Sequence, residues 1–410
     1  MNPIKIILLL IALFLNHASH AEVITLPSEQ EINVEEYGSP DSERHIIWLT
    51  SERGITTDLQ KTVLAISKQS GLHILMPDWH DSYLLASSRS SLDKVPAQDY
   101  QDLITHYTKR YKKLFIAADS RAALIALKTT YQLQVENNHS ISGIVLFAPY
   151  MQKQTPDIGQ NIEYQQIASH SNLPIYVFQA ERSPRFVPLP LLIKTLEQGG
   201  SQVYTHVLNG ITGGYHQRDK EDLNERDLQA LKDLPKQFNT ALTLLAQSDT
   251  APLKPIKSEE VLDEKISPIN LQAVTLQTPA LDLNDLSGKS HKLHDYKGNT
   301  VIVSFWASWC RPCIEEMPSL VKLKQENQDT LEILAVNIRE DSETINKFTS
   351  KMNINFPILQ DHDSTTTDAW KVYVYPSNFI VDKNGKLRYA ATGAMDWQDA
   401  EIEKLLESLN

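Results

Sequence analysis

The feature that most constrains this chain is a pair of cysteines, Cys310 and Cys313, which are the only two in its 410 residues. An apolar run over residues 300–305 indicates a buried strand that leads into the pair, and a helical pattern over 310–325 begins there. At a helix N-terminus a thiol faces free N–H groups and the positive end of the helix dipole, which stabilise a thiolate. The pattern therefore predicts a reactive thiol pair on a strand–helix junction.

The two residues between the cysteines favour the same interpretation. Arg311 adds a positive charge beside the thiol, and Pro312 suits the first helical turn, where no N–H is needed. A zinc site would need further Cys or His ligands, but the sequence has no second C-x-x-C and no H-x-x-x-H pattern. A passive disulfide would close a very small loop and would stabilise the fold little. We therefore expect redox chemistry, with no metal and with no cofactor besides the cysteine pair itself.

Around the cysteines, residues 271–410 alternate between strand and helix patterns. We expect strands at 281–283, 292–293, 300–305 and 331–338, and helices at 310–325, 343–352 and 397–409. A hairpin over 378–390 turns at Asn384-Gly385, a dipeptide that favours tight hairpin turns. This part of the chain is expected to form an α/β domain of its own.

The run VSFWASWCRPCIEEMP at 303–318 resembles the active-site segment of thioredoxins. The wider pattern over 279–393 is similar to the TlpA/ResA branch of exported bacterial thioredoxin-like reductases. The resemblance implies a thioredoxin fold, with Cys310 as the exposed nucleophile and Cys313 as the buried resolving thiol. It also implies that Pro376 is a cis-proline that faces the disulfide and shapes the substrate groove. Trp309, directly before the first cysteine, is expected to cover the sulfur edge.

One position departs from thioredoxins. Ser304 stands where thioredoxins keep a buried Asp that handles the proton of the resolving cysteine. TlpA/ResA relatives also lack that Asp, and many have an acidic residue after the next strand, a place that Glu340 matches. This position makes Glu340 a candidate proton acceptor for Cys313. The alternative is a solvent-exposed glutamate in a charged loop, between Arg339 and Asp341.

The start of the chain has the pattern of a secretory signal peptide. Lys5 supplies a charge, residues 6–15 form an apolar run too short to span a bilayer, and Ser19-His20-Ala21 offers a small-residue cleavage site. The alternative is an uncleaved anchor. We therefore expect a signal peptide over 1–21 and an exported protein, periplasmic in a bacterium. The net charge of −12 argues against nucleic acid as a partner.

The remainder divides at a composition shift. Residues 248–270 are rich in Pro and charge and lack an apolar period, which indicates a linker between a domain over 22–247 and one over 271–410. The first of these domains is predicted to be a mostly parallel α/β sheet. Its expected strands are 45–49, 73–76, 113–117, 143–147, 175–179 and 203–208, and its expected helices are 57–69, 99–111 and 120–130.

Within the first domain, residues 115–123 (FIAADSRAA) resemble the nucleophile elbow of α/β-hydrolases, with Ser120 at the place of the nucleophile. The chain order of that fold is serine, acid, histidine, and Glu181 and His216 follow later strands in that order. Residues 51–54 stand where these enzymes place an oxyanion loop. The alternatives are an ordinary helix-capping serine, and a hydrolase fold that has lost its activity and serves in recognition or docking.

Together these patterns favour an exported thiol–disulfide oxidoreductase that reduces protein disulfides, with the N-terminal domain as a partner-recognition module. The resemblance implies disulfide-containing protein substrates, and a membrane thiol reductase as the electron donor. Two other hypotheses stay open: a bifunctional protein with an active N-terminal esterase or peptidase, and a non-catalytic binding protein whose cysteines only lock the second domain.

Overall fold

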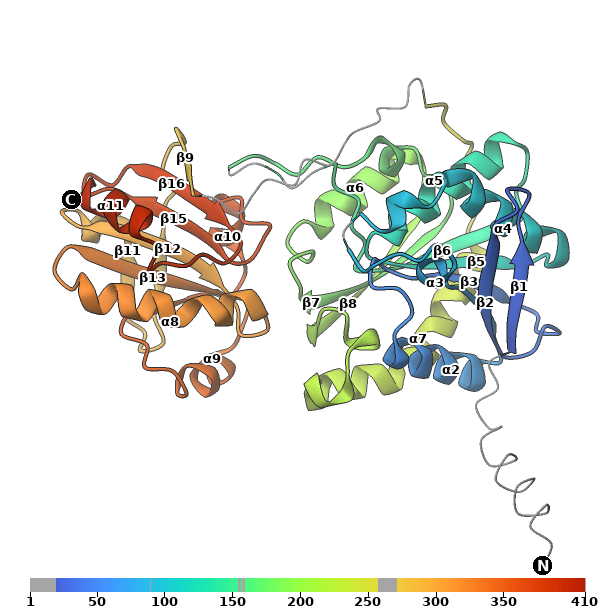
Figure 1. Cartoon of the computed structure of the whole chain (residues 1–410), viewed down its shortest axis with the longest axis horizontal. Helices are drawn as coiled ribbons and strands as arrows, with labels where there is room; N and C mark the ends of the chain where they lie inside the picture. The colour runs from blue at the N-terminus through green and yellow to red at the C-terminus, as the bar shows by residue number, and fades with distance from the viewer. Residues whose placement is uncertain (1–19, 89, 154–155, 157–158, 257–270, 410) are drawn as a thin grey trace, which may run out of the picture. The chain divides into compact units, whose positions relative to one another are not determined.

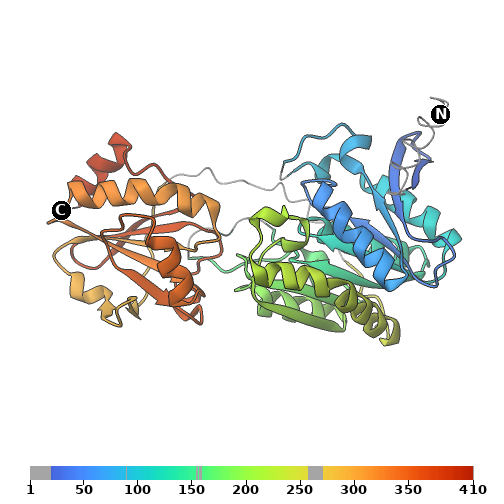
Figure 2. The ribbon, with the colours of Figure 1, turned by 90° about the horizontal axis from the view of Figure 1, so that it is seen from below.

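The computed structural model of the chain describes residues 20–88, 90–153, 156, 159–256 and 271–409 (Figures 1 and 2). Most of the predicted signal peptide, and residues 257–270 of the predicted linker, lie outside the described residues. The chain divides into two compact units. The first consists of Met1–Met151, Tyr164–Ser183 and Pro190–Glu260, and the second of Gln152–Glu163, Pro184–Leu189 and Val261–Asn410.

The N-terminal unit is built on an eight-stranded sheet with the order β1-β2-β4-β3-β5-β6-β7-β8. The strands are β1 (His20–Thr25), β2 (Glu31–Tyr37), β3 (His45–Leu49), β4 (His73–Pro77), β5 (Leu114–Asp119), β6 (Ile141–Phe147), β7 (Ile175–Arg182) and β8 (Val203–Thr212). From β4 to β8 all neighbours are parallel, whereas β1 and β2 are added antiparallel at one edge. The mostly parallel α/β prediction is thus confirmed, and the two edge strands are additions to it.

Helices cover both faces of this sheet, as expected when parallel strands are joined by crossovers. They are α2 (Thr57–Ser70), the short α3 (Trp79–Ser82), α4 (Ala97–Arg110), α5 (Ala122–Val135), α6 (Leu189–Gly199) and α7 (Glu225–Gln247). Helices α2 and α7 pack together on one side, and α4 packs on α5 on the other (Figure 1). Helix α7 begins with a capping box between Asn224 and Asp227, which satisfies the first N–H groups of the helix.

The C-terminal unit contains a six-stranded sheet with the order β14-β13-β12-β15-β16-β9. Its strands are β9 (Gln272–Ala273), β12 (Thr300–Trp306), β13 (Leu331–Ile338), β14 (Ile358–Asp361), β15 (Ser377–Val381) and β16 (Leu387–Thr392). Strands β12, β13 and β14 are parallel, whereas β15, β16 and β9 run antiparallel to their neighbours. A separate hairpin is formed by β10 (Asp282–Asn284) and β11 (Ser290–Lys292).

The helices of this unit are α8 (Arg311–Glu326), α9 (Ser342–Thr349), α10 (Thr365–Ala369) and α11 (Ala400–Glu407). The predicted strand and helix around the cysteines are confirmed as β12 and α8. The predicted hairpin is confirmed as β15 and β16, whose turn has Gly385 in the left-handed region with φ of +81°. The core contains large buried aromatic side chains from four different elements and loops, Phe305, Trp306, Trp370, Phe379 and Trp397.

Over the residues that the structure describes, no helix is both long enough and apolar enough to cross a membrane.

Candidate active site

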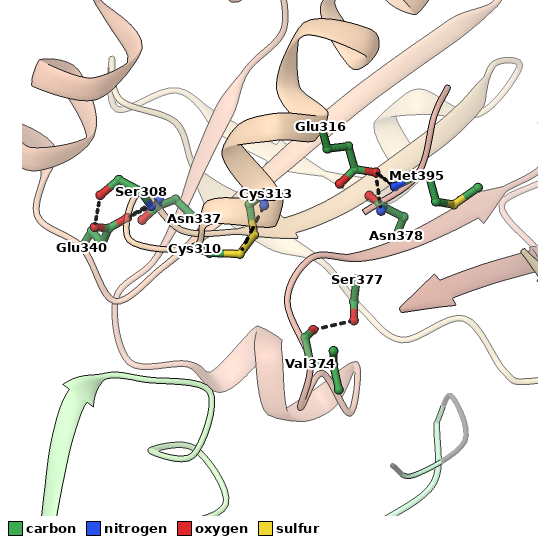
Figure 3. The surroundings of a disulfide bond; sticks show 10 residues. All are labelled: Ser308, Cys310, Cys313, Glu316, Asn337, Glu340, Val374, Ser377, Asn378 and Met395. Carbon is green, nitrogen blue, oxygen red and sulfur yellow. Dashed lines mark hydrogen bonds between the residues drawn. A yellow bond between two sulfur atoms is a disulfide. The ribbon is translucent and has the colours of Figure 1, made fainter. Parts of the chain in front are cut away.

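Cys310 and Cys313 form a disulfide at the junction of β12 and α8, with their Cα atoms 5.3 Å apart. Strand β12 is buried along its whole length between β13 and β15, so the junction is held at the centre of the sheet. Cys310 is the N-cap of α8, and its sulfur accepts a hydrogen bond from the Cys313 backbone N–H at 3.3 Å (Figure 3). The helix thus directs its free N–H groups at the first sulfur, which favours a thiolate there once the disulfide opens.

The two cysteines differ in accessibility in the direction that an attacking and a resolving thiol require. Cys310 is 6% exposed and Cys313 is 1% exposed. Pro312 lies in the first turn of α8, where its missing N–H leaves no bond unmade. Arg311 points outward instead of toward the sulfur: its Nε donates to Glu315 Oε1 at 2.9 Å, and its side chain is 89% exposed. Its charge is therefore screened by solvent and by Glu315.

The loop before β15 carries the predicted cis-proline and an aromatic residue that packs near the disulfide. The Tyr375–Pro376 peptide bond is cis, as the resemblance implied for Pro376. Tyr375 is buried, and its ring meets the ring of Trp309 edge-on at a centroid distance of 5.7 Å. Trp309 is thus fixed against the residue that precedes the cis-proline, an arrangement typical of aromatic pairs in packed sites.

Glu340 is buried, and both of its carboxylate oxygens are engaged by the loop before Cys310 (Figure 3). Oε2 accepts from the Ser308 backbone N–H at 2.7 Å and from Asn337 Nδ2 at 2.9 Å. Oε1 accepts from Ser308 Oγ at 2.5 Å. The alternative of a solvent-exposed glutamate is wrong, because only 2% of this residue is exposed. Its predicted role as proton acceptor for Cys313 stays a prediction.

A second buried carboxylate, Glu316, was not singled out from the sequence. It lies one helical turn after Cys313 on the same face of α8, because residues three apart in a helix are neighbours. Its Oε1 accepts from Trp397 Nε1 at 2.6 Å, Asn378 Nδ2 at 2.9 Å and the Met395 N–H at 3.2 Å. Figure 3 shows Glu316 above Cys313 on α8, directed at Asn378 and Met395.

Burial raises the pKa of Glu316 to about 7, even though the three hydrogen bonds act in the opposite direction. All described hydrogen bonds to this side chain end on Oε1, which leaves Oε2 to carry the proton. A carboxyl group with a pKa near 7 exchanges its proton readily at neutral pH, so Glu316 has the properties of a general acid and base. The signal that could have found it is its spacing of three from Cys313 within the predicted helix.

In the N-terminal unit, the three predicted triad residues have separate hydrogen-bond partners. His216 is buried, and its Nε2 lies 2.6 Å from Asp119 Oδ1. Asp119 also accepts from Trp48 Nε1 at 2.7 Å. Glu181 Oε2 accepts from the Gly210 N–H at 2.6 Å. His216 therefore bonds through Nε2 to an acid that the triad prediction did not include, while its Nδ1 is buried without a hydrogen-bond partner among the described residues.

Ser120 does occupy a strand–helix turn, as predicted. It follows β5 directly, and its φ of +53° places it in the left-handed region, which is costly for a residue with a Cβ atom. Its hydroxyl lies 3.5 Å from Glu52 Oε1, a long hydrogen bond. Glu52 comes from the 51–54 segment that was predicted to lie at this place. The other carboxylate oxygen, Glu52 Oε2, is buried without a hydrogen-bond partner among the described residues.

No group of three or more His, Cys, Asp or Glu side chains that could hold a metal ion occurs in the described part of the chain.

Comparison with known proteins identifies the unit that holds the disulfide. Residues 274–390 match the model of the AhpC/TSA family, a range that contains both cysteines and Pro376. The thiol-disulfide oxidoreductase ResA of Geobacillus kaustophilus is 38% identical over 138 residues, which are 33% of this chain and 78% of that protein. ResA of Halalkalibacterium halodurans is 31% identical over 170 residues, 41% of this chain and 94% of that protein.

Among solved structures, the exposed lipoprotein thioredoxin Etrx1 of Streptococcus pneumoniae is 28% identical, with a TM-score of 0.29. The match covers 32% of this chain and 99% of that one. None of these matches identifies the N-terminal unit. The C-terminal unit is a thioredoxin-like domain with a C-x-x-C redox centre. Through this unit, and on the share of ResA that it covers, the chain belongs to the ResA family of thiol-disulfide oxidoreductases.

Proposed function

We propose that this protein is an exported thiol–disulfide reductase that acts on protein disulfides, and that its N-terminal domain recognises the partner. The observation that carries the proposal is the Cys310–Cys313 disulfide on the N-terminus of α8, in a chain that belongs to the ResA family. The roles that we propose for the site residues follow step by step.

In the reduced protein, the Cys310 thiolate attacks one sulfur of a substrate disulfide. A new S–S bond forms between Cys310 and the substrate, the substrate S–S bond breaks, and the departing substrate sulfur takes up a proton. Cys313 then loses its proton and attacks the Cys310 sulfur. This step breaks the mixed disulfide and leaves the Cys310–Cys313 disulfide, and the second substrate sulfur departs as a thiolate that takes up the proton given up by Cys313. Two electrons have moved from the protein to the substrate.

Glu316 is the group we assign to the Cys313 proton. It lies one turn along the same helix face, is buried, and has a pKa raised by burial to about 7. A thiol has an ordinary pKa near 8.5, so a carboxylate near 7 is well matched to accept its proton as the thiolate attacks. The oxidised protein must afterwards regain two electrons, and we propose a membrane thiol reductase as the donor.

The reductase proposal is tested by trapping. In full-length Cys313→Ala protein the resolving step is absent, so mixed disulfides with Cys310 should accumulate in the periplasmic fraction and should disappear on reduction. The double variant Cys310→Ala/Cys313→Ala is the control and should give no adducts. If the single variant gives no more adducts than the double variant, the reductase proposal fails. Export is tested by sequencing the N-terminus of the mature protein, which should begin near Glu22.

Partner recognition by the N-terminal domain needs a test that leaves the chain whole. Leu84 is 90% exposed on this domain and suits a photo-cross-linking amino acid. If the domain selects the partner, cross-links from position 84 or from other exposed positions of the domain should capture the proteins that are trapped on Cys310. Capture of an unrelated set of proteins would contradict this part of the proposal.

An active serine hydrolase in the N-terminal unit is the second candidate. The observation that favours it is the left-handed Ser120 at the β5–α5 turn, which resembles the elbow of α/β-hydrolases. The described contacts count against it, because Ser120 bonds to Glu52 and no described hydrogen bond joins it to His216. We expect that a fluorophosphonate probe does not label folded protein at Ser120. Labelling that is lost in Ser120→Ala would instead favour the hydrolase.

A further inference from the structure

The segment between β12 and α8 holds Cys310 in place through few bonds of its own. Strand β12 ends at Trp306, and the Cys310 N–H donates to Ala307 O at 3.1 Å in a tight turn. In the oxidised protein the disulfide also ties Cys310 to α8. When the disulfide opens this tie is lost, although the sulfur must stay at the N-terminus of α8 to remain a thiolate. The bonds that stay with Cys310 are then its N–H to Ala307 O, its carbonyl to the Ile314 N–H at 3.1 Å and its sulfur to the Cys313 N–H. A hold on the loop from outside would further restrict the sulfur.

Glu340 supplies such a hold from the neighbouring strand. It follows β13, which is parallel to β12, so the ends of both strands meet at one edge of the sheet. Its two oxygens accept from both the N–H and the hydroxyl of Ser308, two residues before Cys310. Asn337, itself fully buried at the end of β13, donates to the same carboxylate. Hydrogen bonds to a buried carboxylate are about twice as strong as neutral ones.

The backbone conformation of the residue before Glu340 indicates that neighbouring contacts fix the path of the chain at this point. Arg339 has φ of +55°, a left-handed conformation that is unfavourable for a residue with a Cβ atom. The Arg339 N–H donates to Asp361 O at the end of β14. A turn of this kind persists only where neighbouring contacts hold it.

We infer that Glu340 is a positioning residue for Cys310, because its carboxylate clamps Ser308 and so keeps the nucleophile at the N-terminus of α8 when the disulfide opens. The inference rests on the proposed function only in that Cys310 is the attacking thiol. It gives Glu340 a role different from proton transfer to Cys313, and it separates the two buried carboxylates of the site: Glu316 exchanges a proton and Glu340 holds the loop.

The test uses full-length protein with Glu340→Gln, in which an amide replaces one of the two accepting oxygens. The pKa of Cys310 is read from thiolate absorbance of the reduced protein, and the rate of attack is measured on a small aromatic disulfide across pH. We expect a higher pKa of Cys310 and about tenfold less thiolate at pH 7. Because a more basic thiolate is a better nucleophile, the rate should fall only about threefold at pH 7 and should match or exceed wild type at high pH.

Serine variants provide the matched controls. Ser308→Ala removes only the hydroxyl bond and should give a smaller change in the same direction, whereas Ser308→Thr keeps the hydroxyl and should behave like wild type. The double variant Glu340→Gln/Ser308→Ala should be no worse than Glu340→Gln alone, because both changes remove one interaction. These variants also keep the inference testable if Glu340→Gln does not fold.

Three results would overturn the inference. The first is an unchanged pKa of Cys310. The second is a lowered pKa of Cys310, which would mean that the carboxylate charge acts directly on the sulfur. The third is a rate loss that persists at high pH. The last result would mean that the variant impairs attack by another route, because ionisation of both thiols at high pH relieves a raised pKa of Cys310 and also a missing proton acceptor for Cys313. The thiolate titration needs no substrate. It therefore tests the role of Glu340 even if wild-type protein does not reduce disulfides and the proposed function is wrong.

Discussion

The two units of this protein carry nearly the same junction with different chemistry. In each, a small nucleophilic residue lies between the end of a buried strand and the start of a helix. Strand β12 ends at Trp306 and Cys310 is the N-cap of α8, whereas β5 ends at Asp119, directly before Ser120, and α5 begins at Ala122. Cys310 has an ordinary extended backbone with φ of −92°, whereas Ser120 is left-handed with φ of +53°. The same topology therefore presents a thiol without backbone strain and a hydroxyl with it.

The difference lies in what each nucleophile needs. A thiol near a helix N-terminus ionises without a dedicated base, so Cys310 requires only correct placement. A serine hydroxyl requires a base within hydrogen-bond reach, but the described hydrogen bond of Ser120 goes to Glu52, and His216 bonds to Asp119 through Nε2. Placement alone is enough for redox chemistry and is not enough for hydrolysis. We conclude that the same strand–helix junction favours thiol chemistry in the C-terminal unit but is not evidence for hydrolysis in the N-terminal unit.

The largest expected effect separates the two nucleophiles. Cys310→Ala should reduce the turnover of a protein disulfide, such as that of insulin, to the uncatalysed rate, because the one remaining thiol, Cys313, is buried and has no partner with which to close a disulfide. Ser120→Ala should leave that rate unchanged. Turbidity of precipitating insulin chains follows both variants. Residual catalysis in Cys310→Ala, or a loss in Ser120→Ala, would break the comparison.

The next effect concerns Asp119, which we regard as part of the N-terminal fold. Asp119→Ala should cost about 1–3 kcal/mol of unfolding free energy, because it leaves His216 Nε2 and Trp48 Nε1 buried without their acceptor. The matched control is Asp58→Ala, which removes an exposed ion pair with Lys61 and should cost less than about 1 kcal/mol. Urea unfolding measures both. Equal losses would mean that the buried pair does not stabilise the unit.

Glu316 should make the stability of the C-terminal unit depend on pH. Its pKa is raised to about 7 in the folded protein, so between its ordinary pKa and 7 the folded state binds more protons than the unfolded state. The stabilisation is present at low pH and decreases as pH rises through this window, by roughly 3 kcal/mol in total. Glu316→Gln should flatten this dependence in urea unfolding at pH 5 and pH 8. A variant with the wild-type slope would exclude Glu316 as its source.

The smallest effect is expected at Arg311, although the residue stands between the two cysteines. Its side chain is 89% exposed and bonded to Glu315, so its charge contributes little at the sulfur. Arg311→Gln should change the rate of attack at pH 7 by less than about twofold. Stopped-flow measurement with a small disulfide tests this, and Glu315→Gln is the control for the ion pair. A change of tenfold would show that Arg311 turns toward the sulfur in the reduced protein.

Local signals explain what could be predicted from the sequence. The apolar run of β12, the cysteine spacing and the Asn-Gly hairpin all act within a few residues, and the structure has each of them. Strand β2 was missed because its sequence, EINVEEY, is rich in acidic residues that are rare in strands, and its pairing with β4 lies far along the chain.

In the candidate sites, too, the residues that the sequence did not reveal are those defined by contacts in three dimensions. Glu316 was missed because its donors Asn378, Met395 and Trp397 lie 62, 79 and 81 residues away, beyond any local pattern. Asp119 was overlooked for the opposite reason. It directly precedes Ser120, where the hydrolase pattern allows any residue, so only the three-dimensional contact with His216 gave it meaning.

The presence of only two cysteines, joined in one disulfide, limits how electrons can pass through this protein. One chain holds a single electron pair and has no second dithiol in which to store another. In the proposed reductase cycle, substrate meets the reduced pair and the donor meets the oxidised pair, so the two encounters alternate strictly. Flux through the protein is then set by whichever encounter is slower, and an excess of substrate drives the whole population into the oxidised form.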